Sequence, residues 1–263
     1  MNEKKKIRKA LFVLILSGLS VYLGNLGLEK ALSLGNTWYE AGAYILLAGI
    51  GICLFGIYLP FRMASRWELP YAYWPKNKNP IHVIFFLALW FVLMNYDNLT
   101  LIKLNGLNWG VFLEHLSQTL LIQVVYYPLF AMLLFPAFRE RYGLWWSLFI
   151  NGVLFTLYHA LFPALFPEIV HSYTAGYLFI TFIAYMLLYI WSESLILVMI
   201  VHILSNALFL ASKDVLFEST GLLVLIPVLL AVGTLVAMII GAYRQKSAPI
   251  KKPEFWITMN LKD

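Results

Sequence analysis

The chain has 263 residues, of which 62% are hydrophobic and only 12% are charged, and its mean hydropathy is +0.78. Soluble globular domains carry about 25% charged residues, so this composition disfavours a soluble enzyme, a disordered protein and a nucleic-acid-binding module. The net charge of +6 does not by itself imply nucleic acid, because the basic residues gather between apolar segments. The single cysteine, Cys53, excludes an internal disulfide and a multi-cysteine metal site.

Eight segments of 18 to 26 residues without acids, lysines or arginines follow one another along the chain. They comprise residues 10–28, 41–61, 79–96, 115–138, 142–167, 169–192, 194–212 and 219–243. About 20 apolar residues in a helix span the bilayer core, where each backbone polar group must bond within its own segment. The sequence therefore predicts an all-α polytopic membrane protein, with a single bundle of eight transmembrane helices in residues 1–243 and a basic cytoplasmic tail in residues 244–263.

The lysines and arginines indicate the orientation of this bundle. With the N-terminus in the cytoplasm, 16 of the 19 basic residues fall in cytoplasmic segments, as the positive-inside rule requires. Only Lys30, Lys103 and Lys213 fall outside. We therefore expect a multi-pass protein of the cell (plasma) membrane with both termini cytoplasmic. Its expected partners are membrane lipids and a hydrophobic peptide or membrane protein, and nucleic acid is not among them.

Few polar residues lie inside the predicted spans, and such residues are functional candidates because they are costly in lipid. His159 lies in the fifth span, whereas His202 and Asn206 lie four residues apart on one face of the seventh. All three fall at middle depth, so we predict that they converge in one intramembrane site. No carboxylate or cysteine at that depth completes a metal ligand set. No metal and no other cofactor is therefore predicted.

The order of these residues resembles the CPBP family, the CAAX proteases and bacteriocin-processing (Abi) membrane proteins. The segments that carry the resemblance are Pro136-Ala-Phe-Arg-Glu-Arg-Tyr-Gly143, Phe155-Thr-Leu-Tyr-His159, Tyr189-Ile-Trp-Ser-Glu-Ser-Leu195 and His202-Ile-Leu-Ser-Asn206. Family members have a Glu-Glu-x-x-x-Arg helix, a Phe-x-x-x-His helix and a His-x-x-x-Asn helix. The resemblance covers about residues 115–212. It implies a CAAX-protease-like bundle with Phe155 at a substrate or partner cavity and with His159, His202 and Asn206 at the catalytic positions.

The first motif of the family is absent from this chain. Its two glutamate positions fall on Tyr126 and Tyr127, and its arginine position falls on Ala131. In the family the glutamate pair activates a water for peptide hydrolysis, whereas tyrosine, with a pKa near 10, is a poor general base. The retained His159, His202 and Asn206 can supply hydrogen bonds to a peptide, and under the leading hypothesis below they are vestigial as catalytic groups.

Three functions remain open from the sequence. The leading hypothesis is a catalytically impaired family member, a pseudoprotease that binds a membrane peptide or a partner protein. The alternative is an active intramembrane endopeptidase that processes a lipidated or hydrophobic peptide, with Glu193, nine residues before His202, as the first candidate base. A small transporter is a third hypothesis, although no pair of matching broken helices indicates it.

Overall fold

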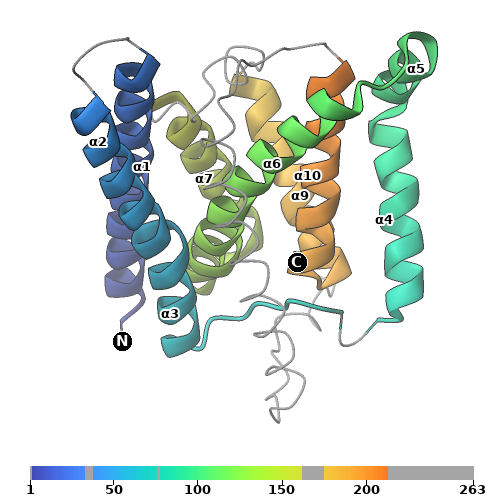
Figure 1. Cartoon of the computed structure of the whole chain (residues 1–263). Helices are drawn as coiled ribbons and strands as arrows, with labels where there is room; N and C mark the ends of the chain where they lie inside the picture. The colour runs from blue at the N-terminus through green and yellow to red at the C-terminus, as the bar shows by residue number, and fades with distance from the viewer. Residues whose placement is uncertain (1, 33–37, 76–77, 162–174, 213–263) are drawn as a thin grey trace. The chain divides into compact units, whose positions relative to one another are not determined.

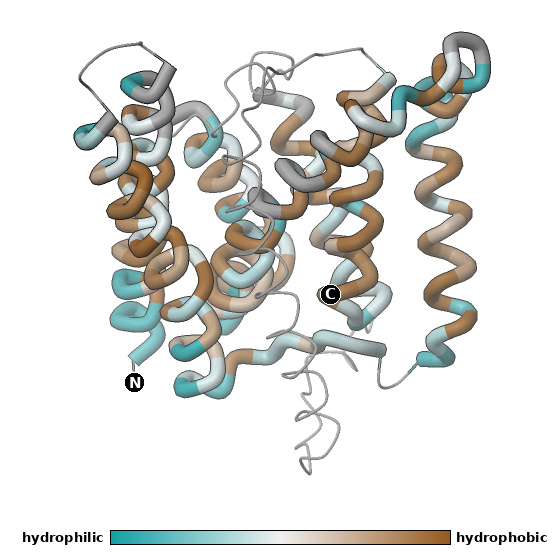
Figure 2. Tube along the Cα trace, viewed as in Figure 1, coloured by the Kyte–Doolittle hydropathy of each residue, from teal (hydrophilic) through white to brown (hydrophobic). Residues whose placement is uncertain are grey.

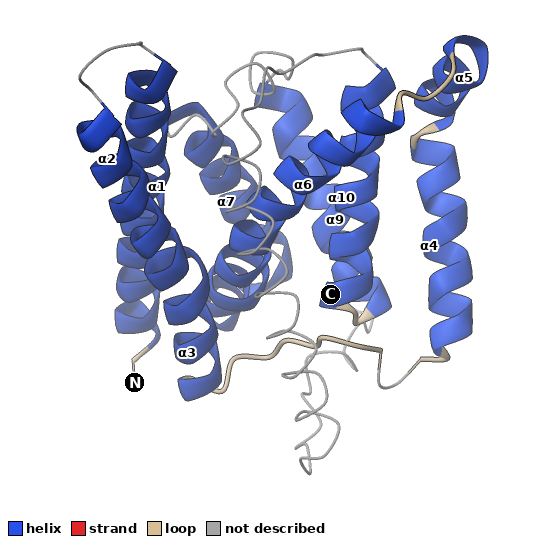
Figure 3. Ribbon diagram, viewed as in Figure 1, coloured by secondary structure: helices blue, strands red, loops and turns tan. Residues whose placement is uncertain are grey.

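The structure is a computed structural model that describes residues 2–32, 38–75, 78–161 and 175–212. Every regular element in these ranges is a helix, and the same ranges contain no strand (Figure 3). The helices, labelled in Figure 1, are α1 (Glu3–Leu32), α2 (Trp38–Gly51), α3 (Leu59–Arg66), α4 (Pro80–Met94), α5 (Tyr96–Asn105), α6 (Trp109–Tyr126), α7 (Phe135–Leu161), α9 (Ala175–Ser192) and α10 (Leu195–Ser212). The predicted all-α fold class is therefore confirmed.

Among the described residues, three helical stretches are long and apolar enough to cross a membrane, and most of their length is hydrophobic (Figure 2). They are Glu3–Gly24, Tyr39–Arg66 and Leu195–Ser212. The pair Pro80–Met94 and Tyr96–Lys103, bent by 66°, makes a fourth if it forms one broken span. These stretches mark the chain as an integral membrane protein, and the expected total of eight spans stays a prediction. The predicted span 219–243 and the tail 244–263 lie outside the described residues.

Two stretches of widened, π-helical backbone interrupt the helices, at Ile52–Tyr58 and at Tyr127–Leu134. Each ends two residues before a proline, Pro60 in the first case and Pro136 in the second. Proline has no backbone N–H, and its ring displaces the carbonyl four residues earlier, so the preceding turn widens. The second stretch contains the two positions Tyr127 and Ala131 of the degraded motif, and it continues directly into α7.

The predicted boundary between the fourth and fifth spans, residues 139–141, falls within α7, and the helix is interrupted two residues later at Gly143. This residue has φ 76° and ψ −177°, outside the helical region, and the chain bends there. Positive φ is inexpensive only for glycine. The helix therefore has a break between the basic segment that contains Arg139 and Arg141 and the apolar segment that contains His159.

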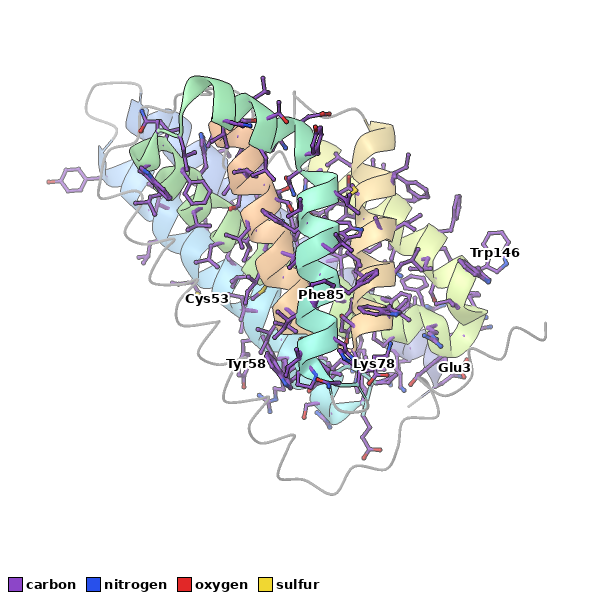
Figure 4. The ribbon with its side chains drawn as sticks, turned by 90° about the vertical axis from the view of Figure 1, so that its right-hand side faces the viewer. Glu3, Cys53, Tyr58, Lys78, Phe85 and Trp146 are labelled. Atoms are coloured by element: carbon purple, nitrogen blue, oxygen red, sulfur yellow. The ribbon has the colours of Figure 1, made fainter. Side chains whose placement is uncertain are left out.

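The helices form two compact units, which we describe separately. The first consists of the described parts of Met1–Leu69 and Val125–Met186, and the second consists of Pro70–Val124 and the described part of Leu187–Asp263. In the first unit α1 and α2 pack along each other (Figure 1). In the second unit α10 packs against α4 and α5. Phe85 on α4 and Trp146 on α7 are 72% and 64% exposed, and their side chains project outward (Figure 4).

We expect Gly152→Val to destabilise the first unit. A Cβ atom at Gly152 would lie 2.7 Å from Cε2 of Phe179, so α7 and α9 would have to separate. Overpacking of this kind costs about 1–3 kcal/mol. The measurement is thermal unfolding in detergent, with Gly176→Val in α9 as the control, because a Cβ there meets nothing within 4 Å. Equal melting temperatures for the two variants would contradict the close packing at Gly152.

Candidate functional site

The residues predicted for the site are divided between the two units. The first unit contains the motif-one and motif-two positions Tyr126, Tyr127, Ala131, Phe155 and His159. The second unit contains the motif-three positions His202 and Asn206. The structure therefore describes each half of the site on its own, and the convergence of the three motif residues stays a prediction.

In the first unit, His159 lies in a buried aromatic cluster. Its ring centroid is 4.2 Å from that of Phe155 and 4.7 Å from that of Tyr126. Phe130 and Phe182 extend the cluster, with centroids 5.3 Å and 4.8 Å from Phe155. All five side chains are less than 9% exposed. The residue at the first glutamate position of the degraded motif is thus a direct neighbour of the motif-two histidine, and it presents a phenol ring.

The hydrogen bond of His159 defines its tautomer. Nδ1 of His159 lies 2.8 Å from the carbonyl oxygen of Phe155, one turn earlier in α7. A carbonyl oxygen only accepts, so in the neutral ring Nδ1 carries the proton and Nε2 keeps its lone pair. His159 can therefore accept one further hydrogen bond at Nε2. This hydrogen bond is local, because α7 places the imidazole of His159 beside a carbonyl group of the same helix, four residues earlier.

The other motif-one positions are buried as well. Tyr127 is 6% exposed and Ala131 is 1% exposed, and both belong to the π-helical stretch that follows α6. Neither residue type supplies a carboxylate or a guanidinium at these positions. Phe155, predicted at a substrate or partner cavity, is 5% exposed within the aromatic cluster, and its role there stays a prediction.

In the second unit, His202 pairs with a residue that the sequence analysis missed. Nε2 of His202 lies 3.4 Å from Nε2 of Gln123 on α6, and the two side chains are 6% and 2% exposed. One turn earlier on α6, Oγ1 of Thr119 donates to the carbonyl oxygen of His115 at 2.8 Å and also lies 3.4 Å from the carbonyl oxygen of Ile203. The signal in the sequence is the spacing of His115, Thr119 and Gln123 at intervals of four, which places three polar side chains on one helical face.

Gln123 changes the chemistry that His202 can perform. A carboxamide donates and accepts hydrogen bonds, but it does not take up a proton near neutral pH. It can orient the imidazole without activating it as a carboxylate would. Asn206 is half-buried one turn beyond His202 on α10. The contact between Gln123 and His202 therefore supplies a hydrogen-bonding group that is not a carboxylate.

A second polar network ties α10 to the bend between α4 and α5. Asn95 at this bend is 3% exposed, and its Nδ2 donates to the carbonyl oxygen of Phe91 and to Oγ of Ser205, both at 2.9 Å. Its Oδ1 accepts from Nδ2 of Asn98 at 3.4 Å, and Oγ of Ser212 donates to Oδ1 of Asn98 at 3.1 Å. Hydrogen bonds of this kind hold helices together in an apolar environment, and here they hold the bent pair of α4 and α5 against α10.

Glu193, the acid considered as a substitute base, lies in the turn between α9 and α10. Its side chain is 5% exposed and its φ is 54°, in the left-handed region. Neighbouring backbone groups secure this turn, because the N–H of Leu195 donates to Ala72 at 2.9 Å and Oγ of Ser194 donates to Tyr73 at 3.2 Å. His202 follows Leu195 by seven residues, or about 10 Å along a helix. The turn therefore holds Glu193 about two helical turns from His202.

No group of three or more histidine, cysteine, aspartate or glutamate side chains that could hold a metal ion occurs in the described parts of the chain. The contacts described above bring imidazoles together with a carboxamide and a phenol. Such groups can bind a polar ligand through hydrogen bonds.

The helices and their buried histidines define an α-helical membrane protein with polar sites among its apolar helices. Residues 128–208 match the family described as type II CAAX prenyl endopeptidase Rce1-like. This match confirms the relationship to the CPBP family of CAAX proteases for a segment that includes His159, His202 and Asn206. The matched segment begins directly after Tyr126 and Tyr127. No curated protein and no solved structure is significantly similar to the chain.

Proposed function

We propose that this protein is a catalytically impaired relative of the CAAX endopeptidases, which binds a hydrophobic peptide or a partner membrane protein without cleaving it. The observation that carries the proposal is the nature of the groups beside the two motif histidines. His159 adjoins the rings of Tyr126 and Phe155, and His202 adjoins the carboxamide of Gln123. None of these neighbouring groups accepts a proton near neutral pH, so none of them replaces the glutamate pair that serves as general base in the family.

The retained polar groups support binding. Nε2 of His159 can accept a hydrogen bond, and the carboxamide of Gln123 lies beside His202 in the second unit. An apolar peptide that leaves the lipid must satisfy its own backbone polar groups inside the protein, because unsatisfied groups cost several kcal/mol there. Imidazole and carboxamide groups can form hydrogen bonds with the backbone of such a peptide without cleaving it.

An active endopeptidase remains the second candidate, because the matched family is described as an endopeptidase. It requires a base that the first motif does not supply. Glu193 is the acid to consider, but its turn is tied to Ala72 and Tyr73 and lies about two helical turns from His202. The geometry of the second unit therefore favours the binding protein.

The test is to reconstitute the full chain in liposomes with fluorescent hydrophobic and prenylated peptides. We expect saturable binding, measured by fluorescence anisotropy, and recovery of full-length peptide by mass spectrometry. Binding without cleavage supports the proposal, whereas cleavage by the wild-type protein, or failure of every peptide to bind, would overturn it.

We further propose that the protein spans the cell (plasma) membrane eight times with both termini cytoplasmic. Within the first unit, Nζ of Lys6 pairs with Oε2 of Glu140 at 2.6 Å. This ion pair supports a common location for the basic start of α1 and the segment that contains Arg139 and Arg141. Burial lowers the pKa of Arg139 to about 10, so this guanidinium remains charged at neutral pH and contributes to the positive cytoplasmic side.

Cysteine labelling tests this orientation. In a Cys53→Ala background, we expect single cysteines at positions 30, 103 and 213 to react with a membrane-impermeant maleimide added outside, because these positions fall in the predicted external segments. Cysteines at positions 62 and 141 serve as controls and should react only after permeabilisation. The reverse pattern would invert the topology, and a mixed pattern would contradict the count of eight spans.

A further inference from the structure

The carboxamide of Gln123 differs from the other buried carboxamide of the second unit, that of Asn95. Both the amide nitrogen and the amide oxygen of Asn95 form hydrogen bonds, since Nδ2 donates to two acceptors and Oδ1 accepts from Asn98. In Gln123 only the amide nitrogen has a partner: Nε2 lies against His202, while the buried Oε1 has no hydrogen-bond partner among the described residues. An unsatisfied buried acceptor is unfavourable, so a ligand that satisfies it gains binding energy there.

We propose that Oε1 of Gln123 accepts a hydrogen bond from a backbone N–H of the bound peptide, and that this peptide is extended at the point of contact. The inference rests on the proposed peptide-binding function and defines which form of peptide the site takes. Gln123 is 2% exposed on α6, within the predicted span 115–138, so we expect its ligand to enter from the membrane. In a membrane helix the N–H groups are already bonded within the helix, and only an unwound or extended segment has one to donate.

His202 holds the acceptor in place. With Nε2 of Gln123 directed at the imidazole, the planar carboxamide turns Oε1 to the opposite side. One turn earlier, Oγ1 of Thr119 lies 3.4 Å from the carbonyl oxygen of Ile203, so α6 and α10 are also close together at that level. A buried hydrogen bond formed here faces no competition from bulk water and is stronger for that reason. Gln123 therefore acts as a binding residue, and His202 acts as its positioning residue.

The experiment is a backbone ester scan with the reconstituted full chain. The probe is a dansylated leucine-rich decapeptide, with analogues in which one amide at a time is replaced by an ester, so that a single N–H is removed. We expect one analogue to bind the wild-type protein roughly five- to tenfold more weakly than the all-amide peptide, the factor that corresponds to one net hydrogen bond.

Variants assign that effect to Gln123. Gln123→Met keeps the length of the side chain but has no oxygen, so it should bind the sensitive analogue and the all-amide peptide equally. Gln123→Glu keeps an acceptor and should retain the discrimination. The matched control is Asn95→Leu, which removes a buried carboxamide already satisfied at both ends and should leave the ester effect unchanged.

Several outcomes would overturn the inference. If the decapeptide binds but no ester analogue binds more weakly than the all-amide peptide, Oε1 of Gln123 binds at most a water molecule. In that case only this inference fails. The same conclusion follows if Gln123→Met keeps the discrimination. If a stable transmembrane helix competes with the decapeptide and shows the same sensitivity, the extended conformation is wrong. If no peptide binds the wild-type protein, the proposed function fails together with the inference.

Discussion

Wild-type protein reconstituted in liposomes is expected to leave prenylated and unmodified hydrophobic peptides intact. The reason is that the first motif has no glutamate pair, and that Tyr126 presents a phenol to His159 and Gln123 presents a carboxamide to His202. Loss of a general base alone lowers a rate by about 10²–10⁴. The missing glutamate pair would also position the attacking water, so the total deficit exceeds that factor.

Variants distinguish a site that has no proteolytic activity from one that cleaves peptides slowly. His159→Ala and His202→Ala should show the same peptide turnover as the wild type, because there is no proteolysis to lose. Tyr126→Glu combined with Tyr127→Glu should not restore cleavage. Ala131 provides no arginine to balance the new charges, and two uncompensated carboxylates in a buried position cost several kcal/mol.

The contrary result would be informative. Cleavage by the wild type that disappears in both histidine variants would establish an active endopeptidase. It would also mean that a carboxylate reaches the site, and Glu193→Gln would then be the first variant to assay. The measurement is mass spectrometry of the peptide products after prolonged incubation.

Phe130→Ala is expected to lower the free energy of unfolding by about 3–5 kcal/mol. Phe130 is 1% exposed, and its ring lies 5.3 Å from Phe155, 5.8 Å from Phe182 and 5.9 Å from Tyr158. Removal of the ring leaves a cavity whose lining loses its van der Waals contacts, and this cost applies in lipid as it does in water. The cluster also surrounds His159, so peptide binding should weaken in the same variant.

The matched control is Phe85→Ala. Phe85 is 72% exposed on α4 and projects outward (Figure 4), so its loss should change the unfolding free energy by less than about 1 kcal/mol. Both variants are to be measured by equilibrium unfolding in mixed micelles of detergent and SDS. Equal destabilisation of the two would show that the aromatic cluster does not form a packed core.

Where local signals are strong, the sequence and the structure agree closely. The predicted span 194–212 corresponds to α10 at Leu195–Ser212, and the span 79–96 corresponds to α4 at Pro80–Met94. At the start of α4, the side chain of Asn79 accepts from the N–H of Ile81 and Pro80 occupies the first turn, an arrangement that stabilises a helix start. These boundaries depend on neighbouring residues, and so they are visible in the sequence.

Other predicted span boundaries differ from the observed helix ends, because a charged residue ends an apolar segment but does not end the helical backbone. The segment 41–61 stops at Arg62, yet the helical backbone continues to Arg66. The segment 115–138 holds α6, a π-helical stretch and the start of α7. Pro136 predicts a distortion, but the packing of the surrounding helices decides whether the backbone kinks or widens.

The sequence by itself determined the helical class, the membrane location, the family relationship and the candidate residues His159, His202 and Asn206. Each depends on composition or on spacing along a single helix, which lipid and backbone geometry impose locally. Only the tertiary structure decided the partners of these residues, the pairing of His202 with Gln123 and the aromatic surroundings of His159. The physical reason is that a hydrogen bond between side chains 79 residues apart depends on how two helices are placed, and no local pattern encodes that placement.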